Sequence, residues 1–127
     1  MKALSIRADY ANEIFMGDKV EEYRSWKTDY RGPLLVCTTQ RKIKGTIPGH
    51  AFVIVNLYDI EKLGDRDYAW QIEVEDFIEP FPVKGKLHLY DVDDSLIHIH
   101  KELRPENKPN QATFDKYFDK YIQPLIY

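Results

Sequence analysis

The chain has 127 residues, of which 43% are hydrophobic and 31% charged, and its formal net charge is −3. These values are typical of one ordinary globular domain, and the negative charge argues against a protein that coats nucleic acid non-specifically. No apolar run approaches the ~20 residues of a membrane span, and no signal-peptide pattern occurs. The single cysteine, Cys37, rules out an internal disulfide. We therefore expect a cytoplasmic monomer without a membrane span.

The chain is predicted to begin with a strand and a short helix. Residues 2–6 have the character of a short strand. Ala11, Ile14 and Phe15 then recur at i, i+3 and i+4, which is the apolar stripe of a helix lying on a core. Gly17 follows at the position where a left-handed residue commonly ends a helix. The helix is therefore predicted to stop there and to lead into the next strand.

This next strand carries polar and aromatic side chains on one face. Glu22, Arg24 and Trp26 occupy every second position, and alternate side chains of a strand point to the same face. A carboxylate, a guanidinium and an indole in a row suit the wall of a polar pocket better than a core. A second strand over residues 33–38 and a polar, basic loop over residues 40–49 are predicted to follow.

The middle of the chain is predicted to contain the longest strands. Residues 51–60 are apolar on both faces and indicate the central strand, and residues 61–67 form a charged turn. Residues 68–75 alternate apolar and polar positions with a period of two, the pattern of another strand. Two prolines within residues 77–82 are expected to bend the chain, and residues 85–92 are predicted to form a further strand.

The carboxyl-terminal part differs from the rest. Residues 103–109 form a proline-bearing linker, and an amphipathic helix is predicted to begin near Asn110 and to weaken at Pro124. Its apolar stripe consists of Phe114, Tyr117, Phe118, Tyr121, Ile122 and Leu125. We expect this stripe to dock on the barrel, and a helix that waits for a protein partner or lipid is the alternative.

Together these elements predict a mainly β, α+β fold. Several strands joined by short turns, with few helices, favour a closed or nearly closed small β-barrel flanked by an N-terminal helix and a C-terminal amphipathic helix. We expect a single domain in which residues 1–102 form the barrel and residues 103–127 form the linker and the docked helix.

A spaced motif at the start of the polar strand resembles that of a known family. Gly17, Lys19, Glu22 and Arg24 give the spacing G-x-K-x-x-E-x-R, which resembles the ASCH domains of the PUA-like superfamily. The resemblance covers about residues 1 to 92 and includes Ser5-Ile6-Arg7, Ser25-Trp26, YRGPLLV at 30–36, Tyr68-Ala69-Trp70 and Pro82-Val83-Lys84-Gly85-Lys86. It implies a PUA-like small β-barrel with flanking helices and a cleft for RNA or a nucleobase.

We expect the motif strand to wall a cleft that binds RNA, a nucleotide or a nucleoside. Arg24 and Lys19 are predicted to meet phosphate or carbonyl oxygens, and Glu22 to accept hydrogen bonds from N–H groups of a base. Trp26 and Trp70 are predicted to offer stacking faces, because single-nucleotide recognition combines stacking with polar readout. The structural alternative is an ion pair between Glu22 and Arg24 that braces the sheet, with Lys19 solvated.

Charge is distributed unevenly along the chain. From Arg24 to Lys44 there are six basic residues and one acidic residue, whereas residues 59–79 contain eight acidic and two basic residues. We predict that Arg41, Lys42 and Lys44 extend a phosphate track away from the cleft. Uneven surface charge without a binding role is the alternative.

A hydrolase acting on a modified nucleoside or on RNA is the alternative function. The resemblance implies that some small family members are amidohydrolases, in which a lysine, a threonine three residues later and a distant glutamate act on a modified cytidine. Lys19 matches the lysine, but Glu22 stands in place of the threonine. Glu22 is then limited to a general-base role on water. Other members are ribonuclease-like, and no acid and base can be assigned for that reaction, so the catalytic residues are left open.

We expect no metal and no cofactor. His98 and His100 share a face if their segment is a strand, and His88 lies on a neighbouring one, but zinc needs three or four converging ligands. Cys37 lies in an apolar strand without an adjacent base, which does not favour a nucleophile. No glycine-rich phosphate loop or dinucleotide fingerprint occurs.

An interaction module acting through the tail helix is a third class of function.

Overall fold

Six strands and two α-helices make up the protein, which we describe from a computed structural model covering residues 1–127. The strands are β1 (Lys2–Ile6), β2 (Glu21–Arg24), β3 (Gly32–Thr38), β4 (His50–Gly64), β5 (Asp67–Pro82) and β6 (Tyr90–Asp91). The helices are α1 (Ala8–Phe15) and α2 (Gln111–Tyr117), and α2 continues into the π-helical turn η4 (Phe118–Ile122) and the 3₁₀ turn η5 (Gln123–Leu125). No helix is long and apolar enough to cross a membrane.

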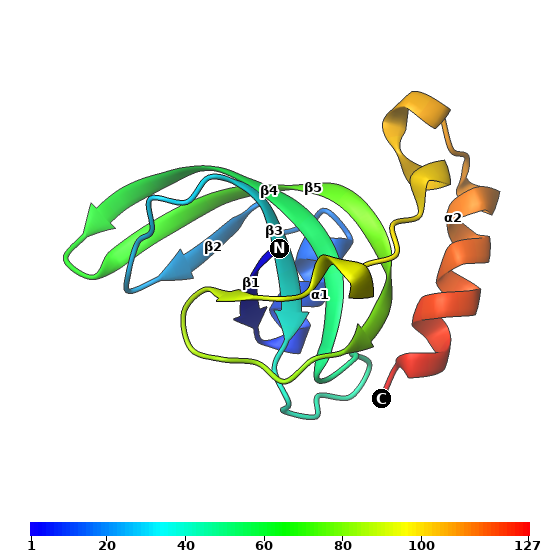
Figure 1. The fold of residues 1–127 in the computed structure, drawn as a ribbon, viewed down its shortest axis with the longest axis horizontal. Helices are drawn as coiled ribbons and strands as arrows, with labels where there is room; N and C mark the ends of the chain where they lie inside the picture. Colours follow the sequence, from blue (N-terminus) through cyan, green and yellow to red (C-terminus); the bar gives the residue numbers. More distant parts are fainter.

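The strands form one curved sheet in the order β2-β5-β4-β3-β1-β6 (Figure 1). Only β1 and β3 pair in parallel, and the other neighbours are antiparallel. The mainly β architecture with two helices is confirmed. The sheet does not close into the predicted barrel, because β2 and β6 lie at opposite ends of the order and do not pair with each other. Both edge strands are short, since β2 has four residues and β6 has two. They therefore offer few backbone groups for the hydrogen bonds that would close a barrel.

The hairpin of β4 and β5 is longer than the sequence predicted. The charged turn shrinks to Asp65 and Arg66, of which Arg66 has a left-handed φ of 53°. β5 continues through the predicted bend to Pro82, and its register with β4 shifts at four places, one of them beside Pro80. Such irregularities bend a strand and free backbone positions where proline is tolerated. The two strands of this hairpin are seen in Figure 1 as long, curved ribbons.

The predicted strand over residues 85–92 is largely absent. Only Tyr90 and Asp91 pair with β1, and the preceding residues run irregularly. His88 takes a left-handed φ of 60°, and Leu87 is 89% exposed, so neither continues an alternating strand. This segment instead forms one side of the pocket described below.

The helices and the tail cover one face of the sheet. Ala11, Ile14 and Phe15 of α1 are buried, and Gly17 ends the helix in the left-handed region, as predicted. Tyr117 and Ile122 of the tail are buried in the same core, and Phe114, Phe118 and Tyr121 are partly buried against it. The Tyr117 hydroxyl donates a hydrogen bond to the Ile78 carbonyl oxygen over 2.6 Å. A second, smaller core lies on the opposite face.

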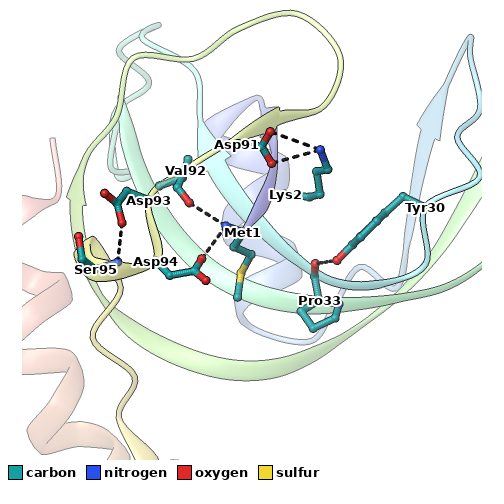
Figure 2. A network of polar contacts seen from close by, with 9 residues as sticks. All are labelled: Met1, Lys2, Tyr30, Pro33, Asp91, Val92, Asp93, Asp94 and Ser95. Carbon is teal, nitrogen blue, oxygen red and sulfur yellow. Dashed lines mark hydrogen bonds and ion pairs between the residues drawn. The ribbon is translucent and has the colours of Figure 1, made fainter.

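Polar contacts fix the amino terminus to the segment that follows β6 (Figure 2). The Met1 amino group donates to the Val92 carbonyl oxygen over 2.7 Å and lies 2.6 Å from Asp94 Oδ1. Lys2 lies 3.1 Å from the Asp91 carboxylate. β1 and β6 are also paired, so the irregular segment before β6 is fixed on the sheet at the end where it enters β6.

Candidate functional site

A pocket of about 670 Å³ opens where β1, the end of β2 and the irregular segment before β6 meet. Its lining residues are Leu4, Ser5, Arg24, Ser25, Trp26, Thr39, Gln40, Lys84, Gly85, Lys86, Leu87 and His88. Of the residues predicted to form a site, only Arg24 and Trp26 line this pocket. We call it the Arg24 pocket.

Arg24 is held in place by two hydrogen bonds of its side chain. Its Nη2 donates to Glu22 Oε2 over 2.8 Å and to the Ser5 carbonyl oxygen over 2.9 Å. Its Nε is buried and has no hydrogen-bond partner. The predicted bond between Arg24 and Glu22 is therefore present. The two contacts orient a planar guanidinium, which is the property that makes arginine suited to recognising oxygen acceptors.

Glu22 and Lys19 belong to the support of Arg24 rather than to the pocket wall. Glu22 is 6% exposed, and its carboxylate contacts Arg24 and, at 3.8 Å, the Lys19 ammonium group. That ammonium group also lies 5.3 Å from the ring centre of Tyr10 and 5.2 Å from that of Tyr23. Neither Glu22 nor Lys19 lines the Arg24 pocket. The ion pair of the structural alternative is therefore present, but Lys19, which that alternative placed in solvent, contacts Glu22 and has a side chain that is 18% exposed.

The two tryptophans have different positions. Trp70 is fully buried, so it has no free face on which a base could stack, and its indole N–H donates to the Trp26 carbonyl oxygen over 3.2 Å. Trp26 is partly exposed and meets Trp70 edge to face, with ring centres 4.8 Å apart. His88, which also lines the pocket, has its ring centre 4.7 Å from that of Trp26. Trp70 therefore supports Trp26, which alone of the two is accessible.

The basic loop lies outside the Arg24 pocket. Arg41, Lys42 and Lys44 are exposed, and none of them lines it. The Gly45 N–H donates to the Tyr127 carbonyl oxygen over 3.2 Å, and the Tyr127 N–H donates to the Thr46 carbonyl oxygen over 2.8 Å. These two backbone hydrogen bonds fix the loop to Tyr127. Lys42 lies 5.7 Å from the Tyr127 ring centre.

The segment from Lys84 to His88 was not predicted as part of a site. The sequence signal was the pair of lysines around Gly85, which had been noted only as part of the family resemblance and not as part of a site. In the structure a Cβ atom at Gly85 would lie 2.4 Å from Ser5 Oγ, so only glycine allows the backbone to approach β1 this closely. Ser5 Oγ is itself fixed, 2.7 Å from the Tyr90 hydroxyl.

We predict that Gly85→Ala destabilises the protein by about 1–3 kcal/mol, the usual cost of overpacking. Ser5→Ala removes the clashing oxygen, so the double variant should cost less than the sum of the two single variants. Urea unfolding of the four proteins measures this. Strictly additive losses would show that the close approach does not constrain this segment.

Burial of Cys37 gives a prediction about alkaline stability. Burial raises the pKa of the Cys37 thiol to about 11 from 9.0. The unfolded chain therefore loses its thiol proton first, and the associated stability is complete below pH 9 and is lost as the pH rises towards 11. At 1.36 kcal/mol per pKa unit the loss is about 2–3 kcal/mol. Urea unfolding below pH 9 and near pH 11 should show it, with a smaller loss in Cys37→Ala. Equal losses in both proteins would contradict it.

The histidines lie in separate surroundings. His88 lies against Trp26, whereas His100 has Nδ1 2.6 Å from Glu102 and Nε2 3.3 Å from Glu79. No group of three or more His, Cys, Asp or Glu side chains is placed to hold a metal ion. His100 instead borders a second pocket, of about 620 Å³, against α2.

Comparison with known families identifies the family of the chain. The family model described as the ASCH domain matches residues 4–118 of the 127-residue chain. The chain belongs to the ASCH domain family, which confirms the resemblance seen in the motif. This family is generally associated with RNA binding and a PUA-like fold. A search of curated proteins gave no match.

Proposed function

We propose that this ASCH domain binds RNA, or a nucleotide-sized part of it, in the Arg24 pocket. The observation that carries the proposal is the placement of an oriented arginine beside an accessible tryptophan in one pocket. The pocket volume of about 670 Å³ lies within the range of about 300–1,000 Å³ usual for small-ligand sites. The family's association with RNA binding supports the choice of ligand.

Each side chain has a distinct role in this proposal. Trp26 stacks on the base, and stacking on an aromatic side chain contributes ~1–3 kcal/mol per base. Arg24 donates hydrogen bonds to a carbonyl or phosphate oxygen. Glu22 is a positioning residue, because it reaches the ligand only through Arg24. The hydrolase alternative gains no support, since neither Lys19 nor Glu22 lines the pocket.

The basic loop extends the interface to longer RNA. Arg41, Lys42 and Lys44 are exposed, and Gln40 lines the pocket at the start of their loop. With two to four phosphates in contact, a log–log salt slope of about −0.7 per contact gives a total between about −1.5 and −3. Lys42→Ala and Lys44→Ala should mainly flatten this slope.

Arg24→Lys tests the proposal. Lysine keeps the charge that faces Glu22 but loses the planar fork, so RNA affinity should fall about tenfold or more, the effect of one lost charge-assisted hydrogen bond. Fluorescence anisotropy with a labelled single-stranded oligouridylate measures affinity at low salt, with Lys62→Ala on the distant β4–β5 hairpin as the matched control. Wild-type affinity in Arg24→Lys would contradict the proposal. Release of product from the RNA under multiple turnover would favour a hydrolase instead.

A further inference from the structure

We infer that the ligand of the Arg24 pocket carries a phosphate group and that Lys84 and Lys86 bind this phosphate. The inference rests on the proposed function and adds to it the part of the pocket that holds the phosphate of the ligand. Neither lysine was predicted as part of the site.

The charge of the pocket lining favours an anionic ligand. Arg24, Lys84 and Lys86 all line the pocket, and no aspartate or glutamate does. The nearest carboxylate on the motif strand, Glu22, is buried and already bonded to Arg24. Neither Lys84 nor Lys86 forms an ion pair with any carboxylate of the chain. A chain with a net charge of −3 thus keeps two unpaired ammonium groups at one pocket.

The backbone that carries these lysines is anchored. The Val83 N–H donates to the Gly49 carbonyl oxygen over 3.0 Å, and Gln40 Nε2 donates to the Val83 carbonyl oxygen over 3.0 Å. Gly85 approaches Ser5 so closely that a side chain would clash. The lysine side chains are flexible, but their points of attachment are fixed beside Arg24 and Trp26.

These positions place the nucleoside-binding and the phosphate-binding side chains on two sides of the pocket. Arg24 already uses Nη2 for Glu22 and Ser5, and its Nε is buried, so Nη1 is the nitrogen left to serve the nucleoside part of the ligand next to Trp26. The two ammonium groups are left for the phosphate, to which lysine binds as a point charge. A phosphate on the ligand should therefore raise affinity by about tenfold or more, the effect of one charge-assisted hydrogen bond.

Isothermal titration calorimetry with three classes of probe tests this inference. The probes are the four common ribonucleosides, their 5′-monophosphates, and dinucleoside monophosphates whose single phosphate is internal. We expect the 5′-monophosphates, the dinucleoside monophosphates or both to bind at least tenfold more tightly than the nucleosides. The class that gains more identifies the phosphate as terminal or as part of an RNA chain. Lys84→Ala combined with Lys86→Ala should remove the gain, and the control Lys62→Ala should retain it.

The possible failures are distinguishable. Nucleosides that bind as tightly as both phosphorylated classes would overturn the inference and leave the proposed function standing. A double lysine variant that retains the full phosphate gain would likewise overturn the inference alone. If no probe of any class binds, the proposed function fails and the inference fails with it.

Discussion

Truncation of Ile122 to alanine is expected to lower the free energy of unfolding by about 2–5 kcal/mol, the usual cost of removing a large buried aliphatic side chain. Ile122 is 2% exposed and belongs to the same core as α1 and the sheet, although it lies in the last turns of the chain. A domain of this size has only about 5–15 kcal/mol of stability, so the loss would be a large part of the total. Urea unfolding followed by circular dichroism measures it.

Leu125→Ala is the matched control for the tail. Leu125 lies three residues further on, in η5, and is 37% exposed, so its truncation should change stability much less. Equal and small effects of the two substitutions would show that the tail is not packed on the sheet in solution. The tail would then be free to bind a partner.

Replacement of Arg24 by alanine is expected to destabilise the fold by about 3 kcal/mol, because it leaves the Glu22 carboxylate buried without its closest partner. Lys19, at 3.8 Å from Glu22, keeps this cost at the low end of the range for a broken buried pair. Thermal and urea unfolding measure the loss. Arg31→Ala, which removes an exposed arginine bonded only to backbone carbonyl oxygens, is the control.

A second substitution shows whether the charge of Glu22 is the cause. Glu22→Gln in the Arg24→Ala background removes the uncompensated charge and should restore a large part of the lost stability. A double variant as unstable as Arg24→Ala would mean that Arg24 acts through packing. This behaviour also explains why Arg24→Lys is the better variant for binding experiments.

The local patterns of the sequence were sufficient to predict several helices and strands. The spacing of Ala11, Ile14 and Phe15 and the glycine at position 17 predict α1 and its end, because these depend only on residues within two turns. Asn110 was likewise recognisable as the start of the tail helix, and its side chain accepts a hydrogen bond from the Thr113 N–H. The strand alternation also placed Glu22 and Arg24 on one face, where they bond.

The rest of the site depends on contacts between distant parts of the chain. Trp70 is fully buried and lies opposite Glu22 in the pairing of β2 with β5. The alternation of residues within β5 does not reveal this pairing, so the burial of Trp70 could not be predicted from it. The position of Lys84 and Lys86 depends on the approach of Gly85 to Ser5, which lies eighty residues earlier. Barrel closure was predicted from the number of strands, but the short edge strands leave the sheet open.

The location of the bound ligand tests the central claim most directly. Titration of the isotope-labelled protein with a nucleoside 5′-monophosphate, followed through its backbone and indole N–H signals by NMR, reports which residues sense the ligand. We predict the largest shifts at Arg24, Trp26 and Lys84 to His88. Shifts centred instead on His100, Lys116 and Lys120, which line the second pocket, would contradict binding in the Arg24 pocket.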